Sequence, residues 1–436
     1  MITPQTLAER RDFLERCTRC SQCKFVPTAK SQRHASACPS MDYGQFHAFS
    51  GGGQLIMGYG LLSGDVEYSD ELVQAVSSCT MCGNCDISCK VNFAETIEPL
   101  DSLYALRAKL VGDGHSPASH ARVMEHLRVT GNAQGYPRGD RGQWAHGLDL
   151  EVSSSAPPDV LLHIGSQLAY DQRRWGALRR VVEVLKASGI ALAHLGVDER
   201  PTGGLAFDLG YVDDATAFAR QMVEQVTRSG ATTLVTFSAP ALAAFRAIYP
   251  RLGHSFKDIR VLHYTEYLQE LVQGNRLLIR SRNHAQASRV AYHDSCKLGR
   301  LSEPWTPHDM QLGNHMGGIL TSRAPQALRF GQGGCYEAPR ALLRYLGFDV
   351  IELERSRASS YCCGAGGGVP ETLPEAAGLA AANRLAELHD AQTSTLISGC
   401  TGCTGHLGKS ASEDVQVRDL IDLLAEALEP VTAPSR

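Results

Sequence analysis

One short segment decides how the N-terminal part of the chain is built: Cys79-Thr80-Met81-Cys82-Gly83-Asn84-Cys85-Asp86-Ile87-Ser88-Cys89. Its first three cysteines are separated by two residues each, and Cys89 follows after three more. A C-x2-C-x2-C turn lets three thiolates approach three corners of an iron–sulfur cubane. The same spacing occurs earlier, at Cys17, Cys20 and Cys23, with Cys38-Pro39 downstream. The two runs predict two [4Fe-4S] cubane clusters.

In two-cluster ferredoxins the fourth ligand of each cubane comes from the other run of cysteines. We therefore predict one cluster held by Cys17, Cys20, Cys23 and Cys89, and a second held by Cys79, Cys82, Cys85 and Cys38. Zinc is the alternative, because C-x2-C pairs also close tetrahedral sites, but zinc sites use two spaced pairs rather than triple runs. The pattern departs from a ferredoxin at Lys90, where proline is expected after the last cysteine.

The C-terminal half carries three more cysteine motifs: His293-Asp294-Ser295-Cys296, Cys362-Cys363-Gly364 and Cys400-Thr401-Gly402-Cys403. Their five thiols converge if the motifs lie on loops at one end of a single α/β sheet, where such folds place their sites. Five thiols exceed what a cubane or a zinc ion uses. Two buried structural cysteines beside a zinc site are the alternative. The glycines at 364 and 366–368 favour a loop that wraps a metal closely.

Composition limits the function classes. The chain has 436 residues, and its 42 Lys and Arg against 46 Asp and Glu give a formal charge of −4, which excludes a broad basic field for nucleic acid. Residues 1–16 lack the apolar core of a secretory signal, and no apolar run is long enough to span a bilayer. Fourteen cysteines then indicate metal ligands or redox groups in a reducing compartment. We expect a cytoplasmic protein that reaches a membrane only through a partner.

The pattern of elements predicts an α+β chain of several parts. Residues 1–115 read as a mostly helical ferredoxin-like domain with a helix at 98–111, and residues 116–158 as a linker with one helix at 118–128. Residues 159–285 and 286–436 read as two related α/β halves, because short apolar runs alternate with amphipathic helical ones in the same order in each. We expect a closing helix at 417–428.

With these motifs in place, the chain resembles the heterodisulfide reductase iron–sulfur subunits, which fuse a ferredoxin-like domain to paired cysteine-rich "CCG" domains. The resemblance covers nearly the whole chain. It implies that five thiolates hold a third cluster, a non-cubane four-iron cluster, and the matching positions are Cys296, Cys362, Cys363, Cys400 and Cys403. It also implies other redox subunits as partners, either a flavoprotein or a quinone-linked membrane subunit.

The first CCG repeat departs from the family pattern. Pro201-Thr202-Gly203 stands where paired cysteines are expected, Phe237 to Pro240 replaces the C-x2-C, and Gly165-Ser166 replaces the leading cysteine. No cluster can be held there by thiolates. Cleavage of a mixed disulfide between two such clusters, which the complete family pattern implies, is therefore in doubt.

Other residues carry weaker signals. Cys335 reads as a buried cysteine rather than a ligand, and His263, His293 and His406 read as histidines that bond to backbone near strand ends. Arg173, Arg174, Arg179 and Arg180 read as a solvated helix face rather than a docking patch. Neither Gly364–Gly368 nor Gly51–Gly53 matches a nucleotide-binding motif.

Two functions follow as expectations. The first is an electron-transfer subunit that relays electrons through two cubanes to or from the C-terminal cluster. The second is a reductase in which the C-terminal cluster itself reduces a disulfide or persulfide, since soft iron sites favour sulfur ligands. A third reading, in which metal only supports the folding of an interaction protein, ranks last.

Overall fold

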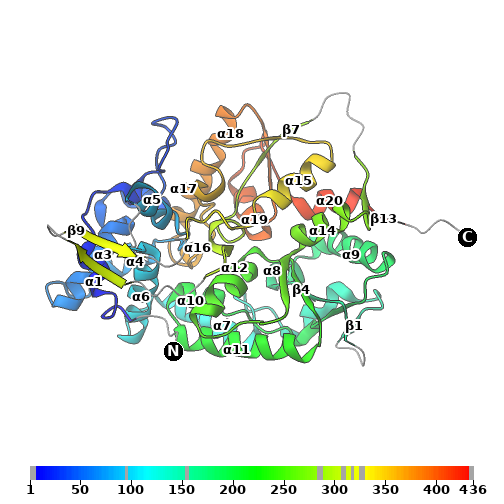
Figure 1. Cartoon of the computed structure of the whole chain (residues 1–436), viewed down its shortest axis with the longest axis horizontal. Coiled ribbons are helices and arrows are strands. Elements are labelled where there is room, and N and C mark those ends of the chain that lie inside the picture. Colours follow the sequence, from blue (N-terminus) through cyan, green and yellow to red (C-terminus); the bar gives the residue numbers. More distant parts are fainter. Residues whose placement is uncertain are drawn as a thin grey trace, which may run out of the picture.

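The computed structural model describes residues 6–93, 97–152, 157–281, 288–305, 311–315, 319–323 and 329–431. A helical N-terminal part lies at one end of the molecule, and two α/β halves lie beside it (Figure 1). The first half is drawn in green and the second in yellow to red. No helix among the described residues is long and apolar enough to cross a membrane.

The N-terminal part is built from short helices with long connections. Two of them begin at serine caps, because the Ser50 side chain accepts a hydrogen bond from Gly53 N and the Ser69 side chain accepts one from Leu72 N. The elements are α1 (Arg11–Arg16), η1 (Gln22–Lys24), α2 (Pro39–Gly44), η2 (His47–Phe49), α3 (Gly51–Ser63), α4 (Asp70–Ser77), α5 (Asn84–Phe93) and α6 (Pro99–Gly112). The predicted helix at 98–111 corresponds to α6.

The first α/β half is organised around a parallel five-stranded sheet of order β1-β3-β2-β4-β5. Its strands are β1 (Glu151–Val152), β2 (Val160–His163), β3 (Leu192–His194), β4 (Thr233–Thr236) and β5 (Arg260–His263). The connections hold α8 (Ser166–Tyr170), α9 (Gln172–Ala187), η4 (Gly196–Asp198), α10 (Gly204–Leu209), α11 (Val212–Arg228), α12 (Ala239–Ala243), a π-helical turn η5 (Ala244–Ile248), α13 (Tyr249–Arg251) and α14 (Tyr264–Gln273).

The second half repeats this topology in a parallel four-stranded sheet of order β10-β7-β11-β12. Its strands are β7 (Arg289–Tyr292), β10 (Asp349–Ile351), β11 (Thr395–Ser398) and β12 (Gln416–Asp419). When the edge strand β1 is left out and strands are counted from β2, both sheets place the second strand on one side of the first and the third and fourth on the other. The repeat predicted from the order of elements is therefore present in the fold.

The remaining elements of the second half surround that sheet. They are η6 (Arg300–Ser302), the antiparallel pair β8 (Gln311–His315) and β9 (Ile319–Arg323), α15 (Glu337–Tyr345), η7 (Arg357–Ser359), α16 (Val369–Thr372), α17 (Pro374–Leu385), α18 (Glu387–Asp390), α19 (Thr401–Ser410) and α20 (Leu420–Ala427). β13 (Leu428–Pro430) pairs antiparallel with β6 (Leu277–Ile279), so the last strand of the chain is joined to the end of the first half.

The expected closing helix at 417–428 begins three residues later. Residues 416–419 form β12, in which Val417 pairs with Leu396 of β11, and α20 starts only at Leu420. The Asp419 side chain accepts a hydrogen bond from Ile421 N, which caps the helix at that point. The sequence pattern missed the strand because four residues are too few for a clear alternation.

Residues 116–158, predicted as a linker, contain α7 (Ala118–Thr130) and the turn η3 (Arg138–Ala145). They also contribute β1, whose Glu151 and Val152 pair with Ala193 and His194 of β3. The segment thus adds an edge strand to the first sheet. The domain boundaries drawn from the sequence stay a prediction.

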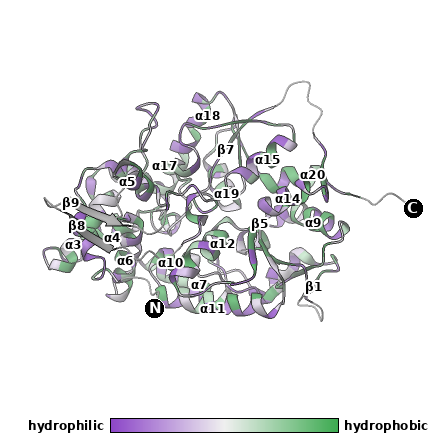
Figure 2. Cartoon of the chain, viewed as in Figure 1, coloured by the Kyte–Doolittle hydropathy of each residue, from purple (hydrophilic) through white to green (hydrophobic). Residues whose placement is uncertain are grey.

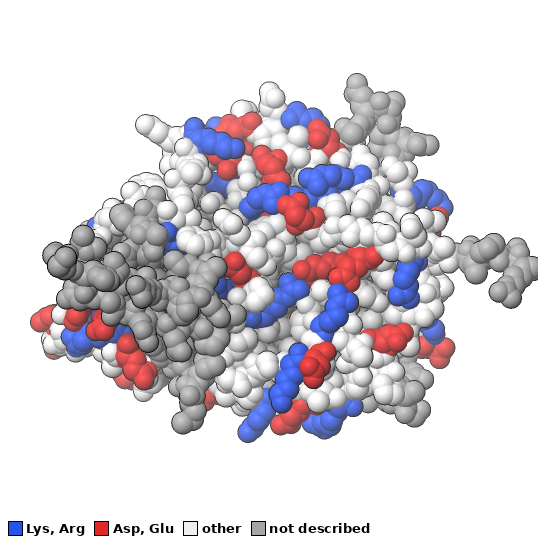
Figure 3. All heavy atoms as spheres, in the orientation of Figure 1, with Lys and Arg blue, Asp and Glu red and all other residues white. Residues whose placement is uncertain are grey.

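The apolar cores run across the boundaries between the parts. Most helices in Figure 2 carry a hydrophobic and a hydrophilic face. One core joins Leu103 and Leu106 of α6 to Phe207 and Leu209 of α10, and the rings of Tyr104 and Phe207 lie 4.6 Å apart. On the surface, basic and acidic side chains are interspersed over the face shown in Figure 3. Burial of shared apolar surface holds the three parts together.

Arg107 of α6 connects all three parts through one buried guanidinium. Its Nη2 donates to the carbonyls of Val76, Ser77 and Cys79, the last at 2.6 Å. Its Nη1 donates to Asp208 O in the first half at 2.8 Å and to Gly367 O in the second half at 2.7 Å. Arg107 is 3% exposed, so no water replaces these bonds if the side chain is lost.

We predict that Arg107→Leu lowers the free energy of unfolding by about 3 kcal/mol, because it leaves several buried carbonyls without donors. The matched control is Arg228→Leu on α11, whose guanidinium is exposed and pairs with Glu224. We expect a change below about 0.5 kcal/mol in the control. Urea unfolding under anaerobic conditions measures both, and equal shifts would contradict a connecting role for Arg107.

Candidate cluster-binding site

The first predicted group of cysteines lies around η1 and α5, which pack against each other. Cys20 is exposed, Cys17 is half-buried and Cys23 and Cys89 are buried. Burial raises the pKa of Cys89 to about 12, and Asp86, Cys23, Cys17 and Cys20 contribute to the rise because nearby negative charge disfavours the thiolate. The structure therefore brings these four thiols together.

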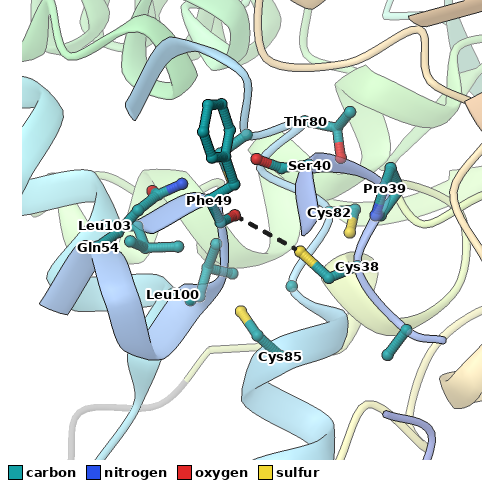
Figure 4. Close-up of a pocket in the computed structure, with 14 residues that line it drawn as sticks. Cys38, Pro39, Ser40, Phe49, Gln54, Thr80, Cys82, Cys85, Leu100 and Leu103 are labelled. Carbon is teal, nitrogen blue, oxygen red and sulfur yellow. Dashed lines mark hydrogen bonds between the residues drawn. The ribbon is translucent and has the colours of Figure 1, made fainter. Parts of the chain in front are cut away.

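The second predicted group lines one cavity in the N-terminal part. Cys38, Cys79, Cys82 and Cys85 share its wall with Leu100 and other apolar residues. In Figure 4 the labelled cysteines of this group surround the same space, and Cys38 Sγ lies 3.9 Å from Phe49 O. Burial first, and then Cys79, Cys38 and Cys82, raise the pKa of Cys85 well above its ordinary value. Four thiols around one largely apolar cavity match the ligand set of a cubane.

The glycines of α3 lie between these two groups. Gly52 N donates to Cys23 Sγ at 3.2 Å, and a Cβ atom at Gly51 would lie 3.2 Å from Cys85 Sγ and 3.8 Å from Cys23 Cβ. Backbone N–H groups at a helix N-terminus favour negative charge such as thiolates. Sequence reasoning considered this run only as a nucleotide motif and missed its position. The serine cap followed by three glycines is the signal that could have found it.

The five C-terminal cysteines come together at the carboxyl end of the second sheet. Cys296 follows β7, Cys362 and Cys363 follow β10, and Cys400 and Cys403 begin α19 after β11. All five are buried, and the Sγ atoms of Cys363 and Cys403 lie 3.2 Å apart. Cys362 interacts with Cys296 and Cys363, and these side-chain hydrogen bonds raise its pKa. The strand order reverses at β7, so the cysteines lie at the switch point where open α/β sheets bind ligands.

The second and third groups of thiols lie next to each other. The pKa of Cys82 is well below its ordinary value, first because of a side-chain hydrogen bond with Cys362, although burial opposes the shift. Arg300 links the segments that carry these two cysteines. Its Nε donates to Cys82 O at 2.6 Å, and its Nη1 donates to Ser360 O, two residues before Cys362, at 2.7 Å. A buried cation beside the sulfurs offsets their negative charge.

The glycine-rich loop after Cys363 fits closely against the N-terminal part. Gly367 and Gly368 have φ of 65° and 73°, which side chains rarely adopt. A Cβ atom at Gly367 would lie 2.6 Å from Cys79 O, and one at Gly366 would lie 2.7 Å from Thr80 O. The loop therefore holds the C-terminal cysteines against the second group, rather than cradling a phosphate.

The first half has hydroxyls where the second has thiols. When Leu161 is aligned with Ala291, their partners Leu234 and Leu396 align as well, and in this alignment Ser166 corresponds to Cys296 and Ser238 to Cys400. Thr202 stands in the segment that corresponds to the paired cysteines. These hydroxyls and all five C-terminal thiols line one cavity of about 220 Å³ between the halves.

A buried ionic network supports the hydroxyl side of this cavity. Glu199 accepts hydrogen bonds from Ile164 N at 2.9 Å and Gly165 N at 3.1 Å, and it pairs with Arg141. Burial raises the pKa of Glu199, but His163, Arg141 and the Ile164 N–H outweigh it and lower the pKa to about 2. The loop after β2 is thereby held by a carboxylate in place of a cluster.

The remaining candidates are accounted for by local bonds. Cys335 is buried, and its Sγ lies 3.6 Å from Thr265 Oγ1. His406 Nε2 lies 3.1 Å from Ala377 O, and His263 caps α14. His293 differs, because one of its ring nitrogens and the Sγ atoms of Cys363 and Cys403 lie within 4.8 Å of one another.

The arginines of α9 have intramolecular partners. Arg173 pairs with Asp171, Arg174 with Asp171 and Asp422, and Arg179 with the carbonyls of Trp144 and His146. Three of the four guanidiniums that could have formed a docking patch are thus engaged within the chain.

Comparison with known proteins agrees with this arrangement. Residues 13–93 match a 4Fe-4S dicluster domain, and residues 327–408 match the CCG cysteine-rich domain. The chain is 28% identical over 435 residues to a subunit of the dihydromethanophenazine:CoB–CoM heterodisulfide reductase of Methanosarcina barkeri, covering 95% of this chain and 94% of that protein.

Two other relatives are longer. The chain is 30% identical to a "Probable membrane-anchored ferredoxin" of Chromohalobacter salexigens, over 81% of this chain and 48% of that protein. It is 27% identical to the "Probable iron-sulfur-binding oxidoreductase FadF" of Bacillus subtilis, over 84% and 48%. The chain spans about half the length of these two relatives. It is thus an iron–sulfur protein that joins a 4Fe-4S dicluster domain to a CCG cysteine-rich domain, with a heterodisulfide reductase subunit among its homologues.

Proposed function

We propose that the chain is an electron-transfer subunit of a redox complex. Two [4Fe-4S] cubanes relay electrons to or from a third, non-cubane cluster near the interface of the two halves. The ligands are Cys17, Cys20, Cys23 and Cys89 for the first cluster, Cys79, Cys82, Cys85 and Cys38 for the second, and Cys296, Cys362, Cys363, Cys400 and Cys403 for the third. These clusters supply the one-electron chemistry, and the chain fixes their order.

The contact between Cys82 and Cys362 carries this proposal. Electron transfer between buried centres slows steeply with distance, and this contact puts a ligand of the second cluster against a ligand of the third. The second group of thiols in turn adjoins the first through Gly51, which faces both Cys85 and Cys23. The first group reaches the surface at Cys20, which is exposed. The three groups of thiols thus follow one another from the surface to the interior, as the clusters of an electron relay would.

The names of the relatives support partners of the expected kinds. A protein of Syntrophomonas wolfei that is 24% identical over 82% of this chain is named "EtfAB:quinone oxidoreductase". We therefore propose a flavoprotein or a quinone-linked membrane subunit as the partner. We also propose a cytoplasmic location, with membrane association through that partner.

Iron content tests the three-cluster proposal. We expect about twelve irons per chain in anaerobically purified protein, and about eight in Cys362→Ser and in Cys400→Ser. The matched control is Cys335→Ser, which removes a buried thiol outside the groups and keeps about twelve. Iron and sulfide analysis with electron paramagnetic resonance measures all four proteins. About eight irons in the unaltered chain would overturn the third cluster.

The exposed edge of the first cluster offers a docking surface for an acidic electron carrier. Residues 16–41 contain no Asp or Glu and include Arg16, Arg19, Lys24 and Lys30, whereas Arg33 pairs with Asp390. Phe25 is 46% and Phe46 67% exposed in the same region, and Lys24 acts electrostatically on Cys23 and His47. Basic charge around an exposed redox centre steers an acidic partner toward it.

We predict that Lys24→Gln slows reduction of the chain by an acidic plant-type ferredoxin about threefold at low ionic strength. The difference disappears at high salt, because salt screens steering between exposed charges. Lys409→Gln, at the exposed end of α19, is the control and keeps the original rate. Stopped-flow absorbance follows the reduction. A rate loss that persists at high salt would point to a changed cluster potential and contradict docking.

A second function is favoured by the cavity between the halves. All five C-terminal thiols line it, and Ser166, Thr202 and Ser238 offer hydroxyls from the opposite side. Its volume of about 220 Å³ suits a small sulfur compound. Reduction of a disulfide there breaks one S–S bond, takes two electrons through the relay and two protons from solvent, and releases two thiols.

Viologen oxidation tests this second function. If the chain is a disulfide reductase, cystamine accelerates oxidation of reduced methyl viologen by the isolated, cluster-loaded chain. Ser166→Phe fills the cavity and abolishes the acceleration, whereas Ser412→Phe at an exposed turn keeps it. If cystamine does not accelerate viologen oxidation by the unaltered chain, the chain is not a disulfide reductase and electron relay is its only function.

A further inference from the structure

His293 lies among the C-terminal thiols at the carboxyl end of β7. It is fully buried, and a ring nitrogen lies within 4.8 Å of the Sγ atoms of Cys363 and Cys403. No nitrogen or oxygen within the described part of the chain pairs with its Nε2, and its interaction is with the side chain of Cys363. A buried ring nitrogen is costly unless a neighbouring group pairs with it, and here that neighbour is a sulfur.

The other ring nitrogen of His293 is already engaged. Arg384 of α17 donates from Nε to His293 Nδ1 at 3.0 Å. Arg384 is itself fully buried and held in place, because its Nη1 donates to Glu387 Oε1 at 2.9 Å and to Arg355 O at 2.8 Å. A guanidinium has only donors and stays protonated in proteins. His293 Nδ1 therefore has to be the acceptor.

This bond settles where the histidine proton is. A neutral imidazole carries one N–H, so an acceptor at Nδ1 puts the proton on Nε2. A histidine that ligates a metal is arranged in the opposite way, since its second ring nitrogen donates to a carboxylate or a carbonyl. Because Arg384 donates to Nδ1, the hydrogen of His293 is on Nε2. The ring therefore directs an N–H group, and not a lone pair, toward the sulfurs.

We propose that His293 donates a fixed N–H···S hydrogen bond from Nε2 to the thiolate of Cys363 or Cys403 and so raises the reduction potential of the C-terminal cluster. This inference rests on the proposed third cluster. An added electron makes the sulfurs more negative, so a donor aimed at them stabilises the reduced state more than the oxidised state. His293 acts through the thiolates as a positioning residue and is not an iron ligand.

The first half supplies a natural control. His163 corresponds to His293 in the alignment that places Leu161 with Ala291 and Leu234 with Leu396. It is also buried, but its Nδ1 lies 2.9 Å from Thr236 Oγ1 and its Nε2 lies 3.7 Å from Glu199. The sequence has no cysteine between residues 90 and 295. His163 thus occupies the corresponding position in the first half but has no thiolate to which it could donate.

The experiment is a redox titration of the cluster-loaded chain, followed by electron paramagnetic resonance. In His293→Leu the signal assigned to the C-terminal cluster shifts to a lower midpoint potential, while the iron content stays at about twelve per chain. His293→Gln, whose amide oxygen and N–H group replace the acceptor and the donor, recovers most of the original potential. His163→Leu leaves the potential unchanged.

Each of the following results would overturn the inference. Loss of about four irons in both His293 variants would make the histidine a ligand, and strong coupling of a ring nitrogen to the cluster in the unaltered chain would lead to the same conclusion. An unchanged potential in His293→Leu, with iron retained, would refute the hydrogen bond while leaving the third cluster intact. About eight irons in the unaltered chain would instead refute the cluster itself. If His293→Leu fails to fold, a potential for His293→Gln far below the original decides against the donor role.

Discussion

The guanidinium of Arg107 is the interaction on which the rest of the structure depends. A buried guanidinium accepts no hydrogen bonds and must be surrounded by acceptors. Arg107 finds these acceptors on the backbones of α4 and its C-terminal connection, of α10, and of the glycine-rich loop after Cys363. Burial of a charge is costly unless it is compensated. Here the carbonyls supply the acceptors; burial still lowers the pKa of Arg107, and the nearby Cys79 opposes that shift. The three parts of the chain therefore have to meet at one point.

The two α/β halves share a topology but differ in the side chains that they place at the cavity between them. The second half keeps five thiols at its switch point, whereas the first has Ser166, Thr202 and Ser238 facing the same cavity. The loops of the first half are held by the Arg141–Glu199 pair and by backbone bonds to Glu199. Lys297 beside Cys296 forms a buried ion pair at 2.7 Å with Asp208 of α10, which ties the halves together across the site. The first half thus serves as a wall and a support for the second.

Much of this arrangement could be predicted because it depends on the spacing of cysteines that are close together in the sequence. The triple-cysteine runs predicted the dicluster domain, and the Cys-Cys-Gly motif predicted the cysteine-rich domain; matches to both families confirm them. The order of apolar runs likewise predicted the two halves. Residues that act across long separations were not predictable in this way. Arg107, Arg300 and Arg384 look like ordinary helix or loop arginines until the fold brings carbonyls, thiols and His293 to them.

The contact between Cys82 and Cys362 has a consequence for how the protein matures. The two thiols come from parts of the chain that are 280 residues apart, and both are buried where the parts meet. The glycine-rich loop after Cys363 packs on Cys79 and Thr80, so it covers the second group of thiols once the parts have met. We therefore expect cofactor insertion at the second group to precede closure of the three parts. A newly made chain is then open while these thiols are loaded, and closure protects them.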